Sequence, residues 1–438
     1  MKFKVANIGC IEHAEMNLNG LTVITGENGS GKSTISKMIF SVIKAVANTA
    51  QENESSQQIR LEKLATSLYK RLTMRNLGVI RETLGRDLWP TIPRDLARKM
   101  WEMRGTDSLK PYLEQIQSII ERSELTPRVK KLSINDIKDI RLLLTTANPA
   151  QELGTEIRSF VESEFMNQIT TEGKESSHVE FLWGPEHSEG VEFEIKNDEL
   201  HMVGCTLDNA LDDATYIESP LYLPLQEALR RSSTYVENNQ AGFLQPMVPL
   251  HVKDISNKYD LLRYYEQDRD TNKFIKQIAG TIGGRFEYDE KKRQIFFKTG
   301  SGQKLMPINV ASGVKTFGLL QILLQIGAIG LNKPLLWDEP ENHLHPEWQI
   351  RFAEMLVLLS QIGIPIVIST HSPYFLQSIR FYAAKYAMTP YLNCYFAERK
   401  ENGLVDMVDV TNDLSRVFVR LAQPLSFIMN IPNEERKV

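Results

Sequence analysis

Residues 26–34 read Gly26-Glu27-Asn28-Gly29-Ser30-Gly31-Lys32-Ser33-Thr34, and they decide the fold of this chain. A β-branched run at 21–25 precedes them and is typical of a buried strand, and the apolar spacing of 35–40 is typical of a helix. The stretch matches G-x-x-x-x-G-K-[ST], the phosphate-binding loop, in the strand, loop and helix order that it requires. The alternative is a glycine-rich turn that only caps a helix, and the complete motif disfavours it. We therefore predict an α/β fold around this phosphate loop.

The residues of the phosphate loop have separate predicted roles. Its glycines allow successive backbone N–H groups to point inward, and the start of the following helix adds partial positive charge. Lys32 is expected to reach the β- and γ-phosphates, Ser33 to place its hydroxyl on Mg²⁺, and Thr34 to lie near the α-phosphate. The sequence thus predicts a nucleotide site with Mg²⁺ as a cofactor.

Length and composition limit what surrounds the loop. The 438 residues exceed one ordinary core, so we expect two lobes or a core with a large insertion. A net charge of -4 argues against a protein that coats nucleic acid over its whole surface. Cys10, Cys205 and Cys394 are far apart, which disfavours a disulfide scaffold or zinc site. With no signal region and no apolar run of about 18 residues, we expect a cytoplasmic protein without membrane contact.

Four segments are predicted along the chain. Residues 1–48 carry the phosphate loop, and 214–438 form the rest of the same core. Residues 49–170 are expected to be a helical insertion, because apolar residues recur there at three- and four-residue spacing. Prolines interrupt this pattern and no heptad repeat is sustained, which disfavours a long coiled coil. The first half of the insertion is basic, so contact with nucleic acid is an alternative role for it. The alternation in 171–213 predicts a small antiparallel sheet as an insertion or lobe.

The last third of the chain carries a second group of candidate residues. Pro334-Leu-Leu-Trp337 reads as a buried strand that ends in Asp338 and Glu339. Sheets of α/β proteins bind their ligands at this end of the strands. Asp338 is therefore expected to hold Mg²⁺, directly or through water, and Glu339 to polarise the attacking water. The turn Ala311-Ser312-Gly313-Val314-Lys315 opens an apolar helix, whose N-terminus is a second anion site.

These motifs together resemble a known family. The phosphate loop, Ser312-Gly313, the stretch from Leu335 to Pro346 and Ser369-Thr-His-Ser-Pro373 are similar to the ABC-type ATPase heads of the RecF, SMC and OLD lineage. Within it, the chain is most similar to stand-alone AAA-family ATP-binding proteins of prokaryotic anti-phage defence systems. The resemblance covers residues 2–48 and 216–382. It implies a P-loop NTPase fold, with a mixed sheet and flanking helices, that hydrolyses ATP with Mg²⁺.

The resemblance also implies roles for individual residues. Ser312 and Gly313 would be the signature motif, which contacts the γ-phosphate bound to a second subunit, and Lys315 could point at that phosphate. Glu341 to His345 would be the D-loop at the dimer interface, and His371 the switch histidine. Gln226 is the candidate for the Q-loop glutamine. A dedicated metal site of Glu341, His343, His345 and His371 is the disfavoured alternative, because the ATPase motifs account for these residues.

Two functions remain in view. The first is an ATP-dependent switch or scaffold that dimerises head to head, as a homodimer or higher homo-oligomer, and controls a separately encoded effector, a nuclease or toxin, in phage defence. The second is a RecF-like repair or recombination ATPase that binds DNA. An ABC transporter subunit is disfavoured, because nearly the whole chain separates the phosphate loop from the signature.

Overall fold

The computed structural model describes residues 1–429 except 52–53, 91, 105, 124, 146–148, 167, 185–186, 198, 209–210, 227, 230–247 and 266–272. The chain forms two compact units, one of Met1–Ala47 with Ile157–Val438 and one of Asn48–Glu156. The predicted α/β fold, with a mixed sheet and flanking helices, is confirmed. Within the described part of the chain, no helix is long and apolar enough to cross a bilayer.

One large sheet organises the first unit. Its eleven strands are β1 (Lys2–Ile8), β2 (Ile11–Asn17), β3 (Leu21–Thr25), β4 (Ser176–Trp183), β5 (Glu189–Lys196), β6 (Glu199–Thr206), β7 (Thr215–Ile217), β11 (Leu335–Asp338), β12 (Ile366–Thr370), β13 (Leu392–Arg399) and β14 (Val405–Asp409). Their order across the sheet is β6-β5-β4-β1-β2-β14-β13-β3-β12-β11-β7.

Five neighbouring strands of this sheet, from β13 to β7, are parallel. All side chains of β3, β11 and β12 are buried, as expected for strands covered on both faces. Because parallel strands share one carboxyl edge, the phosphate loop after β3, Glu339 after β11 and His371 after β12 reach the same edge of the sheet.

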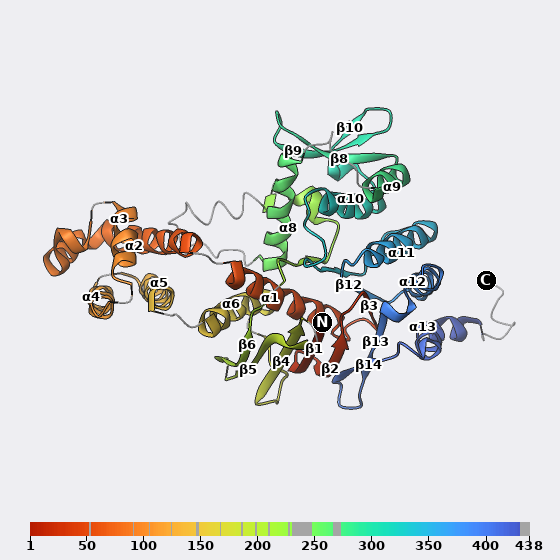
Figure 1. Cartoon of the computed structure of the whole chain (residues 1–438), viewed down its shortest axis with the longest axis horizontal. Coiled ribbons are helices and arrows are strands. Elements are labelled where there is room, and N and C mark those ends of the chain that lie inside the picture. Colours follow the sequence, from red (N-terminus) through yellow and green to blue (C-terminus); the bar gives the residue numbers. More distant parts are fainter. Residues whose placement is uncertain are drawn as a thin grey trace. The chain divides into compact units, whose positions relative to one another are not determined.

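Helices cover both faces of the parallel strands (Figure 1). On one face lie α10 (Ser312–Gln325), α11 (Pro346–Gln361) and α12 (Pro373–Lys385), which share a core with Trp337 of β11. Phe352 of α11 is central there, because the rings of Trp337 and Phe317 meet it edge to face at 5.3 and 5.0 Å. On the other face, Phe40 of α1 (Lys32–Gln51) packs against Tyr216 of β7. The edge that carries the phosphate loop is thus supported from both sides.

A smaller sheet of β8 (Gly284–Asp289), β9 (Gln294–Thr299) and β10 (Lys304–Leu305) packs with α9 (Lys273–Ile282) and α10. Gly318 of α10 lets the Phe286 ring approach, since a Cβ there would lie 2.0 Å from Phe286 Cε2. Further helices of the first unit are α6 (Pro149–Phe165), α8 (Leu250–Asp260) and α13 (Leu414–Met429). Of α6, residues 157–165 belong to this unit.

The second unit is helical. It contains α2 (Glu54–Leu88), α3 (Pro93–Glu102), α4 (Leu109–Arg122) and α5 (Pro127–Thr145) around a core of its own. The rings of Tyr69 and Trp89 stack there at 5.4 Å. Pro93 and Pro127 stand at helix starts, where a missing N–H costs nothing, so these prolines separate helices and do not break them.

The structure differs from the expectation for residues 171–213. The strands within 171–213 form no separate lobe, because β4 pairs with β1 and so extends the main sheet. The helical unit begins at Asn48, one residue before the predicted boundary, within α1, which runs to Gln51.

Candidate functional site

The phosphate loop leaves β3 at Gly26 and enters α1 at Lys32. Gly26, Gly29 and Gly31 have positive φ angles of 154°, 70° and 80°, which favour glycine. Gly31 also has no room for a side chain, because a Cβ there would lie 2.4 Å from Ile11 Cδ1. The start of β2 thus packs closely against the loop and stabilises its curved conformation.

Lys32 is buried and its ammonium lies inside the loop. Its Nζ donates hydrogen bonds of 3.0 and 2.8 Å to the carbonyl oxygens of Gly26 and Glu27. Burial lowers the pKa of Lys32, and the nearby carboxylates of Glu339 and Asp338 act against that change. Ser33 is exposed one position later, and Thr34 lies beside Gly9. The loop therefore offers a cation and an exposed hydroxyl at one helix start.

Asp338 ends β11 and is buried, with both oxygens held by hydroxyls of neighbouring strands. Tyr216 Oη donates to Asp338 Oδ2 at 2.7 Å, and Ser369 Oγ donates to Asp338 Oδ1 at 2.8 Å. Among the described residues, no ion pair neutralises this carboxylate. A carboxylate and the Ser33 hydroxyl are the hard oxygen ligands that Mg²⁺ prefers, so these residues fit that ion. Each oxygen keeps a second lone pair, so Asp338 could hold the ion directly or through water.

Glu339 lies directly after β11 in a strained conformation. Its φ of 45° is unusual for a residue other than glycine. Its backbone N–H donates to Ser369 O at 3.1 Å, and this bond holds the turn. Asn342 Nδ2 donates to Glu339 Oε2 at 2.7 Å, and His371 Nδ1 lies 3.0 Å from Glu339 Oε1. Although burial raises the pKa of Glu339, these two partners outweigh it and the net pKa is lowered.

Glu341 is the most buried acid of this segment. Thr370 Oγ1 donates to Glu341 Oε1, while Oε2 has no hydrogen-bond partner among the described residues. Burial raises the pKa of Glu341 to about 7, against the effect of the Thr370 bond. Glu341 is therefore close to half protonated at neutral pH, unlike Glu339.

The signature turn lies at the start of α10 and contacts α11. A Cβ on Gly313 would lie 3.1 Å from the Trp348 ring and 3.2 Å from Leu344, so glycine allows this close packing. Ser312 is half-buried and Lys315 is buried. In the part of the chain that the structure describes, no hydrogen bond or ion pair joins Ser312, Gly313 or Lys315 to the phosphate loop. The turn thus packs against Leu344, in the segment predicted to be the D-loop.

The candidate Q-loop glutamine is engaged elsewhere. Gln226 Nε2 donates to Asp260 Oδ1 at 3.0 Å, beyond the end of β7. The acid that follows β7 is Glu218. Because Ile217 pairs with Trp337, Glu218 comes next to Asp338 at this edge of the sheet. Sequence reasoning missed Glu218 and Tyr216, and it named Ser369 only as part of the motif around His371. The signal that could find Glu218 is its position directly after a strand, the same signal that predicts the acids at the end of β11 and the histidine after β12.

The phosphate loop, the paired acids at the carboxyl end of β11 and the histidine after β12 define a P-loop NTPase. The chain belongs to the AAA ATPase domain family, whose model matches residues 1–376. No curated protein matches the sequence.

Solved structures similar to this chain include SMC head domains. The SMC head domain from Thermotoga maritima has 12% identity and a TM-score of 0.39, over 93% of this chain and 98% of that one. The Smc head bound to the C-winged helix domain of ScpA has 13% identity and a TM-score of 0.43, over 95% of this chain and 98% of that one. The Smc head with an extended coiled coil, bound to the C-terminal domain of ScpA derived from Pyrococcus furiosus, has 11% identity and a TM-score of 0.42, over 96% and 98%.

Proposed function

We propose that this chain binds ATP with Mg²⁺ on the phosphate loop and hydrolyses it with Glu339 as the general base. The observation that carries the proposal is the pair formed by Glu339 and His371, 3.0 Å apart at the carboxyl ends of β11 and β12. Lys32 lies close enough for the charge of Glu339 to affect its pKa. A base and a phosphate-binding cation therefore share one edge of the sheet.

The residues divide the chemistry between them. Glu339 is ionised at neutral pH because its pKa is lowered, so it can accept a proton from an attacking water. Asn342 and His371 each bond one of its oxygens and fix its orientation. Lys32 supplies positive charge where phosphate oxygens gain negative charge. Ser33 and Asp338 would hold Mg²⁺, which neutralises charge on the bound phosphates.

The proposed assembly is a pair of heads around ATP. Ser312 and Gly313 stand at a helix N-terminus, where backbone N–H groups can bind a phosphate. Since this turn makes no polar contact with the phosphate loop of its own chain within the described residues, a loop on a second copy is the natural ligand. ATP would then join the two copies, and its hydrolysis would release them.

As its role, we propose an ATP-dependent switch or scaffold that controls a separate effector protein in a prokaryotic anti-phage system. The residues that support this proposal are the ATPase motifs, which resemble those of defence ATPases. The helical unit 48–156 has its own core and is not needed to build the sheet, so it can serve as the partner-binding module. A nucleotide cycle in the first unit would set when that module is presented.

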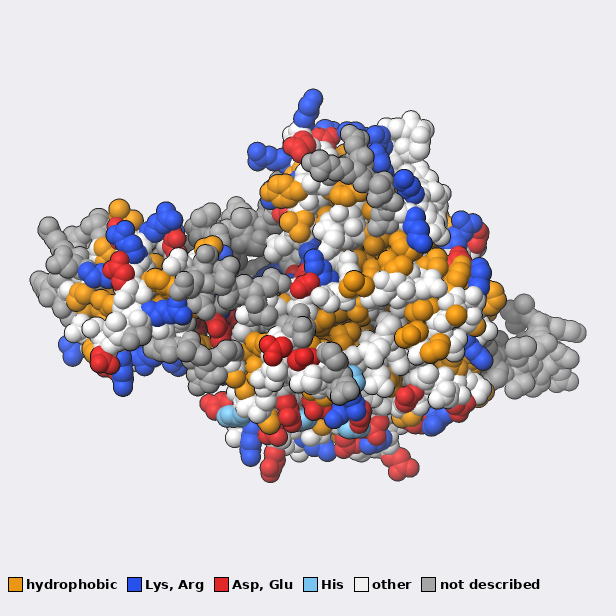
Figure 2. Space-filling model, in the orientation of Figure 1, with side chains coloured by type: hydrophobic (Ala, Val, Ile, Leu, Met, Phe, Trp, Pro, Cys, Tyr) orange, Lys and Arg blue, Asp and Glu red, His pale blue; other side chains and the backbone are white. Residues whose placement is uncertain are grey.

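A second candidate function is DNA binding, and one surface favours it. Residues 273–304 contain eight Lys and Arg against three Asp and Glu, in a chain whose net charge is -4. Figure 2 shows Lys and Arg side chains, with a few Asp and Glu among them, in the region of β8, β9 and β10. Such a surface suits a phosphate backbone. Anisotropy titrations with labelled duplex DNA at 50 and 200 mM salt would test it, and affinity that is weak and unchanged by Lys291→Glu with Lys292→Glu would exclude it.

Phosphate release with ATP and Mg²⁺ tests the ATPase proposal. We expect turnover by the full chain, and loss of both ATP binding and turnover in Lys32→Ala. Equal ATP affinity of Lys32→Ala and wild type in calorimetry would contradict the assignment of the phosphate loop.

A further inference from the structure

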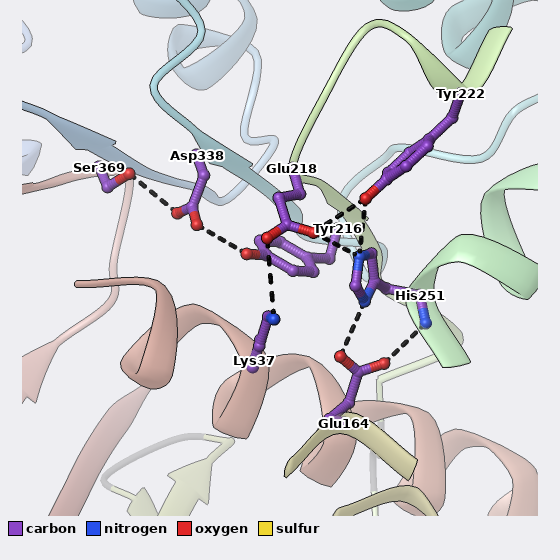
Figure 3. A network of polar contacts seen from close by, with 8 residues as sticks. All are labelled: Lys37, Glu164, Tyr216, Glu218, Tyr222, His251, Asp338 and Ser369. Carbon is purple, nitrogen blue, oxygen red and sulfur yellow. Dashed lines mark hydrogen bonds and ion pairs between the residues drawn. The ribbon is translucent and has the colours of Figure 1, made fainter. Parts of the chain in front are cut away.

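A buried histidine outside the ATPase motifs bonds two carboxylates. His251, in the first turn of α8, has no exposed side-chain surface, and neither has Glu164 of α6 (Figure 3). Glu164 accepts from the His251 backbone N–H at 2.7 Å, and its other oxygen lies 2.7 Å from His251 Nδ1. On the other side of the ring, Nε2 lies 3.1 Å from Glu218 Oε2. The imidazole therefore bridges α6 and the segment after β7.

The charges of this bridge favour an ionised Glu218. Burial lowers the pKa of His251, but the bonds to Glu164 and Glu218 outweigh it and the net pKa is raised. The bond from His251 is also the main cause that lowers the pKa of Glu218 to about 2. A second bond, from Tyr222 Oη at 2.8 Å, holds the same carboxylate. Glu218 is thus a fixed anion and is still 40% exposed.

Glu218 follows β7 next to Asp338, one of the residues expected to hold Mg²⁺. The in-register pairing of β7 with β11 makes Glu218 the neighbour of Asp338 at the carboxyl edge. Lys37 Nζ lies 3.8 Å from Glu218 Oε1, and Lys37 is one helical turn after Ser33 on α1. Tyr216, which bonds Asp338, also packs edge-on against the His251 ring at 4.9 Å (Figure 3). The carboxylate therefore lies beside the metal-binding end of the phosphate loop.

We propose that His251 is a positioning residue of the ATPase site, which holds the Glu218 carboxylate toward bound Mg²⁺ by anchoring it to Glu164 of α6. This inference rests on the proposed ATPase function. A histidine that only fills the core would stabilise the fold and leave the nucleotide site unchanged. A positioning residue should act on kcat and on the Mg²⁺ dependence of ATP binding, and it should act through Glu218.

The test compares His251→Ala, Glu218→Ala and the double variant in the full chain. Each single change is expected to lower kcat about tenfold with KM changed less than about threefold, and the double variant should be no slower than either, because the two residues act as one unit. Calorimetry with ATP, with and without Mg²⁺, gives a readout that does not need turnover. The gain in affinity from Mg²⁺ should shrink in all three variants.

Two further variants keep the test decisive. His251→Gln retains an amide that can donate to Glu218, so it should recover part of the kcat lost in His251→Ala. His178→Ala is the control, because His178 of β4 also lies near two glutamates, 3.5 Å from Glu192 and 3.9 Å from Glu194 of β5. It should leave kcat and the Mg²⁺ gain unchanged. If His251→Ala does not fold, Glu218→Ala and Tyr222→Phe test the same carboxylate from its exposed side.

Some results would overturn the inference. Wild-type kcat and a wild-type Mg²⁺ gain in Glu218→Ala would contradict it, and so would losses that add in the double variant. A wild-type chain that binds ATP without hydrolysing it would instead overturn the proposed function, and the Mg²⁺ titrations would still decide the role of His251.

Discussion

Tyr216 on β7 donates a hydrogen bond of 2.7 Å to Asp338 on the neighbouring strand β11, and both side chains are buried. With Ser369 on the other oxygen, the bond fixes the carboxylate that is expected to hold Mg²⁺. Three parallel strands thus build this part of the site. The acid is recognisable from its own strand, but its two partners come from strands that are distant in sequence.

Tyr216→Phe should therefore impair the site more than the fold. Losing the hydroxyl leaves Asp338 Oδ2 with one partner fewer in a buried place, at a cost of about 1–2 kcal/mol of stability. We expect kcat to fall about tenfold and the Mg²⁺ concentration for half-maximal rate to rise. Tyr112→Phe is the matched control, because its hydroxyl donates to Leu88 O at 2.6 Å inside the helical unit. It should lower stability similarly and leave kcat unchanged. Equal kinetics of the two variants would contradict the role of Tyr216.

Glu341 predicts a pH dependence of stability. Burial raises its pKa from 4.5 to about 7, so between these values the folded chain binds more protons than the unfolded one. The contribution of Glu341 to the free energy of unfolding is then largest below pH 4.5. It falls by about 3 kcal/mol in total as the pH rises through 7. Glu341→Gln keeps an acceptor for Thr370 and removes the titration. Its melting temperature relative to wild type should rise from pH 5 to pH 8, and a constant difference would refute the assignment.

The two-headed assembly predicts complementation. Lys32→Ala lacks a working phosphate loop, and Ser312→Arg blocks the signature turn, so each homodimer should be inactive. A mixture should form one composite site per heterodimer and recover part of the ATPase rate. No recovery, together with a specific activity that is independent of concentration, would argue for a monomeric ATPase.

The helical unit is predicted to be separable from nucleotide binding. Replacing residues 54–145, which span α2 to α5, by a flexible linker should leave ATP affinity within about threefold of wild type, because the sheet and α6 remain. If the proposed effector binds this unit, the same variant should fail to retain that effector in pull-downs. Retention of the effector would place the binding surface in the first unit.

What could be predicted from sequence follows from how local each feature is. The phosphate loop lies between one strand and one helix, so its motif carried the fold. Asp338, Glu339 and His371 each follow an apolar strand, which placed them on the carboxyl edge of the sheet. Glu218 also follows a strand, but β7 has only three residues and gives a weak pattern.

Other features depend on pairings that spacing does not reveal. The register of β7 with β11 decides that Tyr216 reaches Asp338 and that Glu218, not Gln226, stands at this edge. The pairing of β4 with β1 joins strands about 170 residues apart and makes one sheet of two predicted ones. Side chains such as His251 and Glu164 belong to no motif and are brought together only by packing.

The central claim, hydrolysis of ATP with Glu339 as the base, is tested most directly by Glu339→Gln. The variant keeps an acceptor for Asn342 and removes the charge that takes the proton. We predict ATP affinity within about threefold of wild type in calorimetry and phosphate release slowed about 10² or more in single-turnover assays. Hydrolysis at the wild-type rate with unchanged ATP binding would contradict the account.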